Sequence, residues 1–110
     1  MTLVLASSSA IRRHMLEQAG ITFEIQAANV DEAAEKALRS EAAGLTAALA
    51  GAKAVEVSRE RPGDWVIGSD SAATVDGRIF DKPRDREQAA EHLRFFSGKT
   101  MQLTSAVALA

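Results

Sequence analysis

The sequence contains no cysteine, only two histidines and little net charge. The absence of cysteine excludes disulfide bonds, thiolate catalysis and zinc sites with cysteine ligands. The histidines, His14 and His92, lie far apart in the chain, which argues against a histidine-based metal site. With a net charge of −2, no overall basic field attracts a nucleic-acid polymer. Any polyanion that the protein binds must therefore meet a local cluster of cations.

Long hydrophobic runs are also missing. No apolar run approaches the roughly 20 residues that span a bilayer, and residues 2–6 lack the basic flank and the length of a signal peptide. We therefore expect a cytoplasmic protein without a membrane partner. Residues 106–110 are all apolar, with no polar residue to close the stretch. This ending predicts a chain that is truncated on its C-terminal side.

Short apolar runs alternate with helical patterns along the 110 residues. Asp76-Gly77 between two short apolar segments predicts a two-residue hairpin, and the alternation predicts an α/β fold with a mixed sheet and flanking helices. We expect one domain over residues 1–110. The predicted strands cover residues 3–6, 21–26, 65–68, 72–75, 78–80 and 100–110. The predicted helices cover about 10–19, a long stretch from about 31 that Gly44 and Gly51 interrupt, and a segment capped by Asp85 with Ala89, Leu93 and Phe96 inward.

Three serines, Ser7 to Ser9, precede the first predicted helix. Helix N-termini carry unpaired N–H groups and a positive potential, which suit phosphate. Arg12 and Arg13 in the first turn are disfavoured by the helix dipole, and a bound phosphate would compensate for them. The segment is not a P-loop, because the glycines and the Gly-Lys-Ser/Thr ending are missing. A serine N-cap followed by two solvated arginines explains the same pattern, and spacing alone gives both interpretations equal weight.

Gly68-Ser69-Asp70-Ser71 directly follows a predicted buried strand. The carboxyl edge of an α/β sheet is where such folds usually bind ligands. A carboxylate there can hold Mg²⁺ or orient an attacking water. Taken alone, Asp70 is more simply a turn residue that accepts hydrogen bonds from nearby amides.

Two lysines complete the candidates. Lys53 stands between alanines on a helix that otherwise faces a core, and Pro83 favours an extended backbone at Lys82. A single lysine is usually a solvated surface group, and this remains the simpler interpretation of each. Asp31 and Glu32 likewise fit the negative charge that a helix N-terminus favours.

Together, the order and spacing of these segments resemble the Maf family, also described as septum formation inhibitor-like proteins. The resemblance covers essentially all 110 residues. The matching segments are Leu5 to Ser9 before Arg12-Arg13, Val30-Asp31-Glu32, Leu49-Ala50 with Lys53-Ala54, Val66 to Asp70, Asp76-Gly77, Lys82-Pro83, Arg86 to Ala89, and Ser97 to Thr100 before Thr104 to Leu109.

The resemblance implies an α/β fold with two lobes around a cleft, related to that of inosine triphosphate pyrophosphatases. It also implies hydrolysis of a nucleoside triphosphate between the α- and β-phosphates, with Mg²⁺ or Mn²⁺ as cofactor. By position, Asp70 resembles the catalytic proton acceptor, and Asp70 with Glu32 resembles the metal-binding acids. The phosphate-binding residues that it implies are Ser7, Ser9, Arg12, Arg13, Lys53 and Lys82.

Two departures from the family pattern bear on base selection. Ala10 and Ile11 stand where the family often has proline and then arginine or tryptophan. Ser71 stands where the dTTP/UTP group commonly has threonine and the 7-methyl-GTP group has glutamine. Gly68-Ser69-Asp70, in contrast, is more similar to the 7-methyl-GTP group. These residues leave both base preferences open.

Family members are nearly twice as long as this chain, which predicts a fragment or an incomplete cleft. A homodimer is one way to rebuild part of the missing wall. Two alternatives to the pyrophosphatase stay open. One is a non-catalytic nucleotide-binding regulator of septum formation and cell division, and the other is an α/β fragment that folds only with its missing half.

Overall fold

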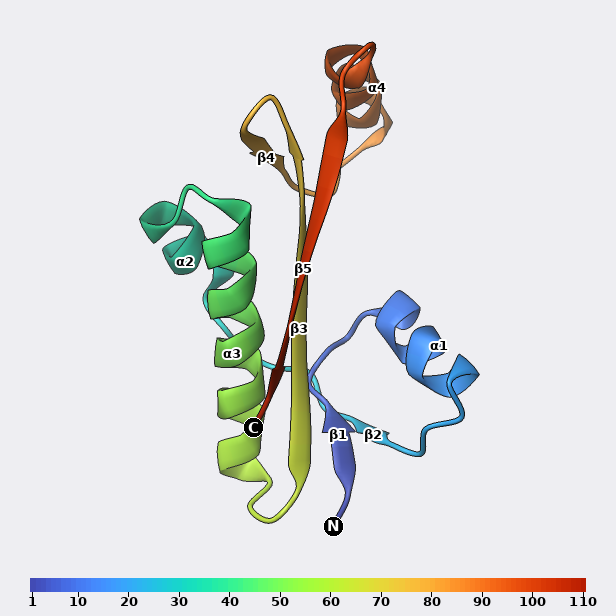
Figure 1. The fold of residues 1–110 in the computed structure, drawn as a ribbon, viewed down its shortest axis with the longest axis vertical. Helices are drawn as coiled ribbons and strands as arrows, with labels where there is room; N and C mark the ends of the chain where they lie inside the picture. Colours follow the sequence, from blue (N-terminus) through green and yellow to red (C-terminus); the bar gives the residue numbers. More distant parts are fainter.

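The computed structural model describes residues 1–110 and shows a mixed five-stranded sheet with four helices (Figure 1). The predicted α/β class is therefore confirmed. In chain order the elements are β1 (Leu3–Leu5), α1 (Ala10–Gln18), β2 (Glu24–Ile25), α2 (Glu32–Leu38), α3 (Ala42–Glu60), β3 (Trp65–Val75), β4 (Arg78–Phe80), α4 (Arg86–Phe96) and β5 (Met101–Leu109).

The long strand β3 organises the sheet. β5 runs antiparallel along one edge of β3, from Ile67 opposite Leu109 to Val75 opposite Met101. The opposite edge is shared by two short strands. β1 pairs in parallel with residues 65–67, and β4 pairs antiparallel with residues 73–75. Residues 68–72 therefore have no strand partner on this second edge, and this gap in the pairing contains Asp70.

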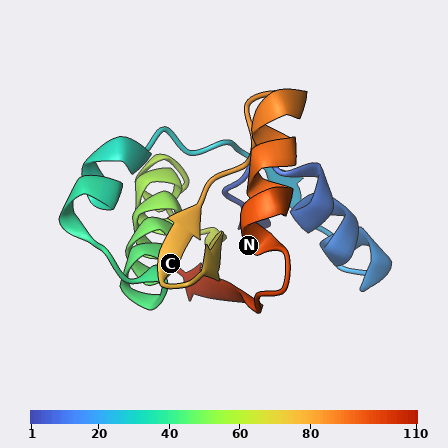
Figure 2. The same ribbon diagram turned by 90° about the horizontal axis from the view of Figure 1, so that it is seen from above.

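The core lies between the sheet and α3, which covers one face of it (Figures 1 and 2). Val66 on β3 and Val4 on β1 are fully buried against Ala54 and Val57 of α3. Burial alternates along β3, and its second, fourth, sixth and eighth residues are buried. This is the pattern of a strand with one covered face.

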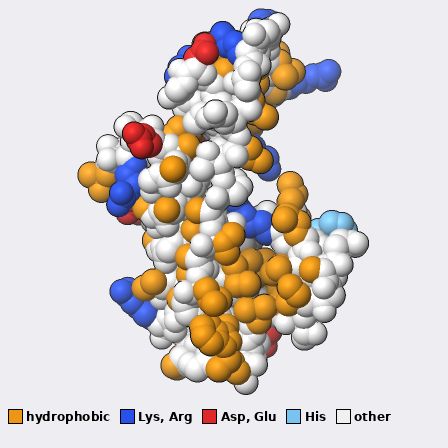
Figure 3. All heavy atoms as spheres, in the orientation of Figure 1, with side chains coloured by type: hydrophobic (Ala, Val, Ile, Leu, Met, Phe, Trp, Pro, Cys, Tyr) orange, Lys and Arg blue, Asp and Glu red, His pale blue; other side chains and the backbone are white.

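The other face of the sheet is largely open, with α1 beside its lower part and α4 beside its upper end (Figures 1 and 2). α1 has no buried residue. Large apolar side chains remain exposed there, among them Trp65, Val107 and Leu109. Figure 3 shows hydrophobic side chains gathered over the lower part of the sheet and beside α1. An apolar surface of this kind usually marks an interaction site.

Local signals for turns and helix caps are confirmed. Asp76 and Gly77 both have positive φ, as the hairpin turn between β3 and β4 requires. Ser9 caps α1 by accepting a hydrogen bond from the Arg12 amide. Asp85 caps α4 in the same way, from the Gln88 amide at 2.8 Å. None of the four helices combines the length and the hydrophobicity that a membrane-spanning segment requires.

Three expected element details are wrong. The long helix from residue 31 is interrupted at 39–41 and not at Gly44 or Gly51, because both glycines lie inside α3. A glycine costs a helix only about 1 kcal/mol, and the buried face of α3 offsets that cost. The strand predicted for 21–26 is reduced to Glu24–Ile25. Leu93 points to solvent, because α4 packs through Phe95 and Phe96 on Phe80 of β4.

Candidate active site

The serine loop forms a small cavity at the N-terminus of α1. Ser7 is buried, and its Oγ accepts a hydrogen bond from the Ser9 amide at 3.0 Å. Ser9 is the N-cap of α1. The cavity measures about 190 Å³, and its wall combines hydroxyls, two cations and one carboxylate. Its lining residues are Ala6, Ser7, Ser8, Ser9, Arg12, Ala28, Val30, Glu32 and Lys53.

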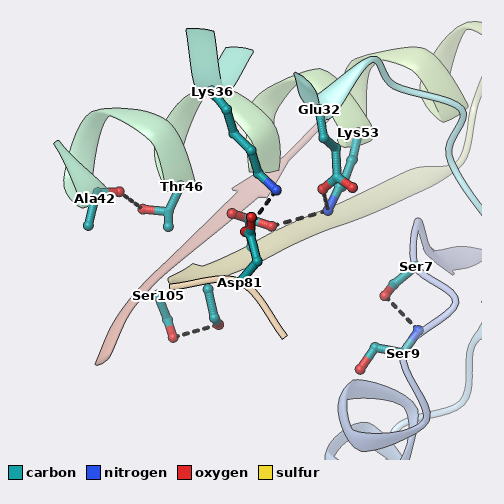
Figure 4. A network of polar contacts seen from close by, with 11 residues as sticks. Ser7, Ser9, Glu32, Lys36, Ala42, Thr46, Lys53, Asp81 and Ser105 are labelled. Atoms are coloured by element: carbon teal, nitrogen blue, oxygen red, sulfur yellow. Dashed lines mark hydrogen bonds and ion pairs between the residues drawn. The ribbon is translucent and has the colours of Figure 1, made fainter. Parts of the chain in front are cut away.

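Lys53 joins this loop to two carboxylates from other elements. Its Nζ lies 3.2 Å from Asp70 Oδ1 and 3.2 Å from Glu32 Oε1. The Lys53 side chain is only 15% exposed, so the prediction that it lies in a less wet setting than a typical lysine is confirmed. Figure 4 shows Glu32 and Lys53 pointing toward one another beside the serine loop.

The position of Asp70 corrects the sequence interpretation. Asp70 is not a turn residue after a strand, because it is the sixth residue of the continuous strand β3. It is 9% exposed and accepts a hydrogen bond from Lys53 of α3. Nevertheless, it lies just beyond the end of β1, where the second edge of β3 has no strand partner. The carboxylate thus lies just past the carboxyl end of the parallel pair β1 and β3, the edge at which α/β sheets usually bind ligands.

Gly68 explains why Lys53 and Asp70 meet. A Cβ atom at Gly68 would lie 2.7 Å from the Ala54 amide nitrogen and 2.9 Å from its Cβ. These separations are too short for any side chain, so α3 approaches β3 closely only because residue 68 is glycine. Lys53 precedes Ala54 by one residue, and Asp70 follows Gly68 by two. The close approach of α3 to β3 therefore places Lys53 over Asp70.

A second cavity adjoins the first on the side of β4. It measures about 390 Å³ and shares Glu32 with the serine-loop cavity. Lys82 is exposed and lines this cavity together with Asp70 and Ser71. The full lining is Glu32, Lys36, Leu45, Leu49, Asp70, Ser71, Ala72, Ile79, Phe80, Asp81 and Lys82.

Two of the predicted site residues lie apart from these cavities. The Arg13 guanidinium turns along α1 and pairs with Glu17 at 3.0 Å. Ile11 is 75% exposed on α1 and lines neither cavity. Ser71, in contrast, lines the second cavity, and its hydroxyl lies 2.8 Å from the Ser105 hydroxyl of β5.

The structure adds two residues that sequence reasoning missed. Lys36 Nζ lies 2.9 Å from Asp81 Oδ1, across the second cavity from α2 to the segment after β4. The hydrogen bond from Lys36 to Asp81 raises the pKa of Lys36, and the negative charges of Asp81, Glu32 and Asp70 raise it further against the opposing effect of burial. Glu32 and Lys36 are four residues apart, a spacing that places both on one face of a helix. This spacing is the signal in the sequence that could have identified Lys36.

The arrangement fits an anionic ligand held with a divalent cation. Arg12, Lys53 and Lys82 supply positive charge, and the Ser7–Ser9 loop supplies N–H and O–H donors. No group of three or more histidine, aspartate or glutamate side chains forms a metal cage. However, Glu32 and Asp70 converge on a single cationic nitrogen. Two carboxylates completed by water and phosphate oxygens are a common donor set for Mg²⁺.

Sequence comparison gives one consistent family. The family model described as Maf-like protein matches residues 2–110. A protein named 7-methyl-GTP pyrophosphatase from Brucella suis biovar 1 (strain 1330) is 46% identical over 112 residues, which cover 98% of this chain and 56% of that protein. A protein of the same name from Rhizobium johnstonii is 45% identical over 111 residues, 97% of this chain and 56% of that protein.

A third relative carries a broader name. The nucleoside triphosphate pyrophosphatase of Sphingopyxis alaskensis is 44% identical over 115 residues, which cover 100% of this chain and 58% of that protein. The chain thus spans a little more than half the length of the curated relatives it matches. With the family model matching residues 2–110, the chain belongs to the Maf family.

Proposed function

We propose that this chain carries the phosphate-binding residues and the catalytic acids of a nucleoside triphosphate pyrophosphatase. Such an enzyme releases a nucleoside monophosphate and pyrophosphate. The observation that carries the proposal is the position of Lys53, which lies between Asp70 and Glu32 and lines the serine-loop cavity. Hydrogen-bond donors suited to phosphate and a pair of carboxylates therefore occupy one site. The names of the relatives support the same reaction.

Glu32 and Asp70 would hold the divalent cation, Mg²⁺ or Mn²⁺. Their carboxylate oxygens suit these hard cations, which also take phosphate oxygens and water as ligands. When bound, the cation neutralises phosphate charge and lowers the pKa of a coordinated water. An aspartate has an ordinary pKa near 4 and is a weak base by itself, so a carboxylate in this role benefits from such activation.

Asp70 orients the attacking water and accepts its proton, while the oxygen attacks the α-phosphorus in line with the departing pyrophosphate. The bond from the α-phosphorus to the bridging oxygen breaks, and the electron pair leaves with pyrophosphate. Arg12, Lys53 and Lys82 neutralise the negative charge on that leaving group. Electrostatic stabilisation of this kind is the main requirement in phosphoryl and nucleotidyl chemistry.

An assay for pyrophosphate release tests the proposal. The purified chain is incubated with Mg²⁺ or Mn²⁺ and a nucleotide panel that contains 7-methyl-GTP, dTTP, UTP and the common triphosphates. We expect metal-dependent release of one pyrophosphate per monophosphate. Nucleotide binding without release would favour the non-catalytic regulator, and release of inorganic phosphate would place the cleavage at another bond.

A further inference from the structure

The ion pair between Lys36 and Asp81 lies inside the second cavity and has no place in the proposed mechanism. Lys36 belongs to α2, and Asp81 follows β4, 45 residues later. Both line the cavity that also contains Asp70 and Lys82. In Figure 4, Lys36 reaches from α2 toward Asp81 on the same side of α3 as Glu32 and Lys53.

Lys36 is placed to act on the same ligand as Lys53. Glu32 and Lys36 are four residues apart on one helix, and such residues lie side by side on the helix surface. The hydrogen bond to Asp81 is the main cause of the raised pKa of Lys36, and the charges of Asp81, Glu32 and Asp70 raise it further against the effect of burial. Lys36 therefore stays protonated at neutral pH, and it lines the same cavity as Glu32 and Asp70.

Asp81 is a weak competitor for this ammonium group. Its side chain is 70% exposed and that of Lys36 is 41% exposed, and ion pairs with this exposure contribute little stability. One carboxylate uses only one of the three N–H donors of Lys36. A phosphate group carries more charge and more acceptor oxygens than a carboxylate. It can therefore replace Asp81 as the partner of Lys36.

We propose that Lys36 is a further substrate-binding residue of this site, and that its ammonium group leaves Asp81 to donate to the β- and γ-phosphates of the nucleotide. Asp81 pairs with this ammonium group in the absence of substrate and competes with the phosphates for it. Lys36 and Lys82 together bind the β- and γ-phosphates, which therefore lie on the side of the site next to β4. This assignment rests on the proposed function, because it presupposes a triphosphate whose α-phosphorus lies near Asp70.

Calorimetric titration with inorganic pyrophosphate tests the assignment without requiring turnover. Lys36→Gln removes the charge, and we expect it to weaken pyrophosphate binding about tenfold, the lower range for a lost charge-assisted hydrogen bond. Lys36→Arg should restore binding to within about threefold of the unmodified chain. Arg39→Gln is the matched control, because Arg39 lies on the same short segment but pairs with Glu35 outside the cavity. It should leave binding unchanged.

Asp81→Asn separates a binding role from a structural one. Both Lys36→Gln and Asp81→Asn break the same ion pair, but only Asp81→Asn keeps the ammonium group and removes its competitor. We therefore expect the Asp81→Asn variant to bind pyrophosphate at least as tightly as the unmodified chain. Weaker binding in both variants would show that the ion pair only supports the fold and would overturn the assignment.

The two proposals fail in distinguishable ways. Hydrolysis by the unmodified chain with unaltered pyrophosphate affinity in Lys36→Gln would overturn the role of Lys36 alone. Pyrophosphate binding that depends on Lys36, in a chain that hydrolyses no triphosphate, would overturn the proposed function and leave the role of Lys36 intact. An unmodified chain that does not bind pyrophosphate would also overturn the assignment of Lys36.

Discussion

Asp70 combines burial, a single ion-pair partner and a position in the gap left by β1 and β4. Asparagine has nearly the same shape and can still accept the hydrogen bond from Lys53, but it cannot take up a proton from water. We expect Asp70→Asn to abolish pyrophosphate release and to leave nucleotide affinity within about tenfold, about 1.4 kcal/mol. Release is measured in steady state, and affinity by titration.

The matched control for this substitution is Asp76→Asn. Asp76 lies on the hairpin turn with φ of 50°, a conformation that asparagine also adopts. The control removes a carboxylate of the same hairpin far from Lys53 and should keep normal activity. Near-normal release by the Asp70→Asn variant would show that another group accepts the proton.

Lys82 differs from Lys53 because it lines the second cavity without an ion-pair partner. Its ammonium group is therefore available to the phosphates of a ligand. We expect Lys82→Ala to raise the half-saturating concentration of a triphosphate about tenfold, the effect of one charge-assisted hydrogen bond. The affinity for a monophosphate should change less, because that ligand lacks the β- and γ-phosphates.

The comparison needs both ligands and a neighbouring cation. Arg84→Ala removes an exposed charge two residues away, which pairs with Asp85, and should leave both affinities intact. Equal losses for the monophosphate and the triphosphate in Lys82→Ala would place Lys82 at the α-phosphate or the nucleoside.

At the scale of elements, the contact between α3 and β3 depends on Gly68. A methyl group at this position would press on the backbone of Ala54, and we expect Gly68→Ala to destabilise the fold by about 1–3 kcal/mol, the usual cost of overpacking. Gly51→Ala is the control. Its Cβ would meet nothing within 4 Å, and alanine favours a helix by up to about 1 kcal/mol.

Urea denaturation of both variants measures the two effects. The expected changes have opposite signs, a loss of stability for Gly68→Ala and a gain for Gly51→Ala. If both glycines tolerated alanine equally, the close approach of α3 to β3 would not depend on Gly68.

The loop between α3 and β3 makes a pH-dependent contribution to the stability of the fold. The Asp64 carboxylate accepts a hydrogen bond from the Thr2 amide and another from Arg61, both at 3.1 Å. These bonds, the first above all, lower the pKa of Asp64 below its ordinary value of 3.8. A lowered pKa in the folded state means that the carboxylate stabilises the fold above pH 3.8 and loses this effect as the pH falls through the folded value.

Asp64→Asn should therefore lower the melting temperature at pH 7. The difference from the unmodified chain should shrink as the pH falls below about 4 and disappear once Asp64 is protonated in the folded state. Thermal unfolding between pH 7 and pH 2 measures this. A difference that stays constant over the whole range would mean that the charge of Asp64 is not responsible.

At the scale of the whole molecule, the dominant feature is the unpaired edge of β5, next to the open face of the sheet. β5 pairs only with β3, so its outer edge has no strand partner. Val107 on this strand is 73% exposed, and Leu103 and Leu109 are exposed as well. An exposed apolar edge strand promotes pairing with another chain. We expect the purified chain to self-associate through residues 101–110, as a dimer or as a larger soluble assembly.

Sedimentation velocity at micromolar concentration tests this prediction. Val107→Lys should shift the distribution toward the monomer, because a charged side chain disfavours strand-edge pairing. Leu38→Lys introduces the same charge at an exposed apolar position of α2, which packs against α3, and should leave association unchanged. A compact monomer with cooperative unfolding, without any substitution, would contradict the prediction.

The sequence predicted the local features of the fold. The hairpin at Asp76-Gly77 and the caps at Ser9 and Asp85 follow from residues within four positions of one another, whose preferences act before any tertiary contact forms. The family resemblance added the candidate residues of the site. The sequence did not predict the break at 39–41, because the tertiary packing of α3 overrides the low helix propensity of Gly44 and Gly51.

What the sequence by itself determined is the set of chemical groups: no thiol, one serine loop at a helix start, and carboxylates and cations in a fixed order. The tertiary structure decided which of these groups meet. Lys53 contacts Asp70 because α3 and β3 pack closely at Gly68, and Lys36 meets Asp81 across 45 positions of chain. Arg13 instead finds its partner one helical turn away. The physical reason is that contacts between distant residues depend on strand pairing and helix packing, which no local pattern specifies.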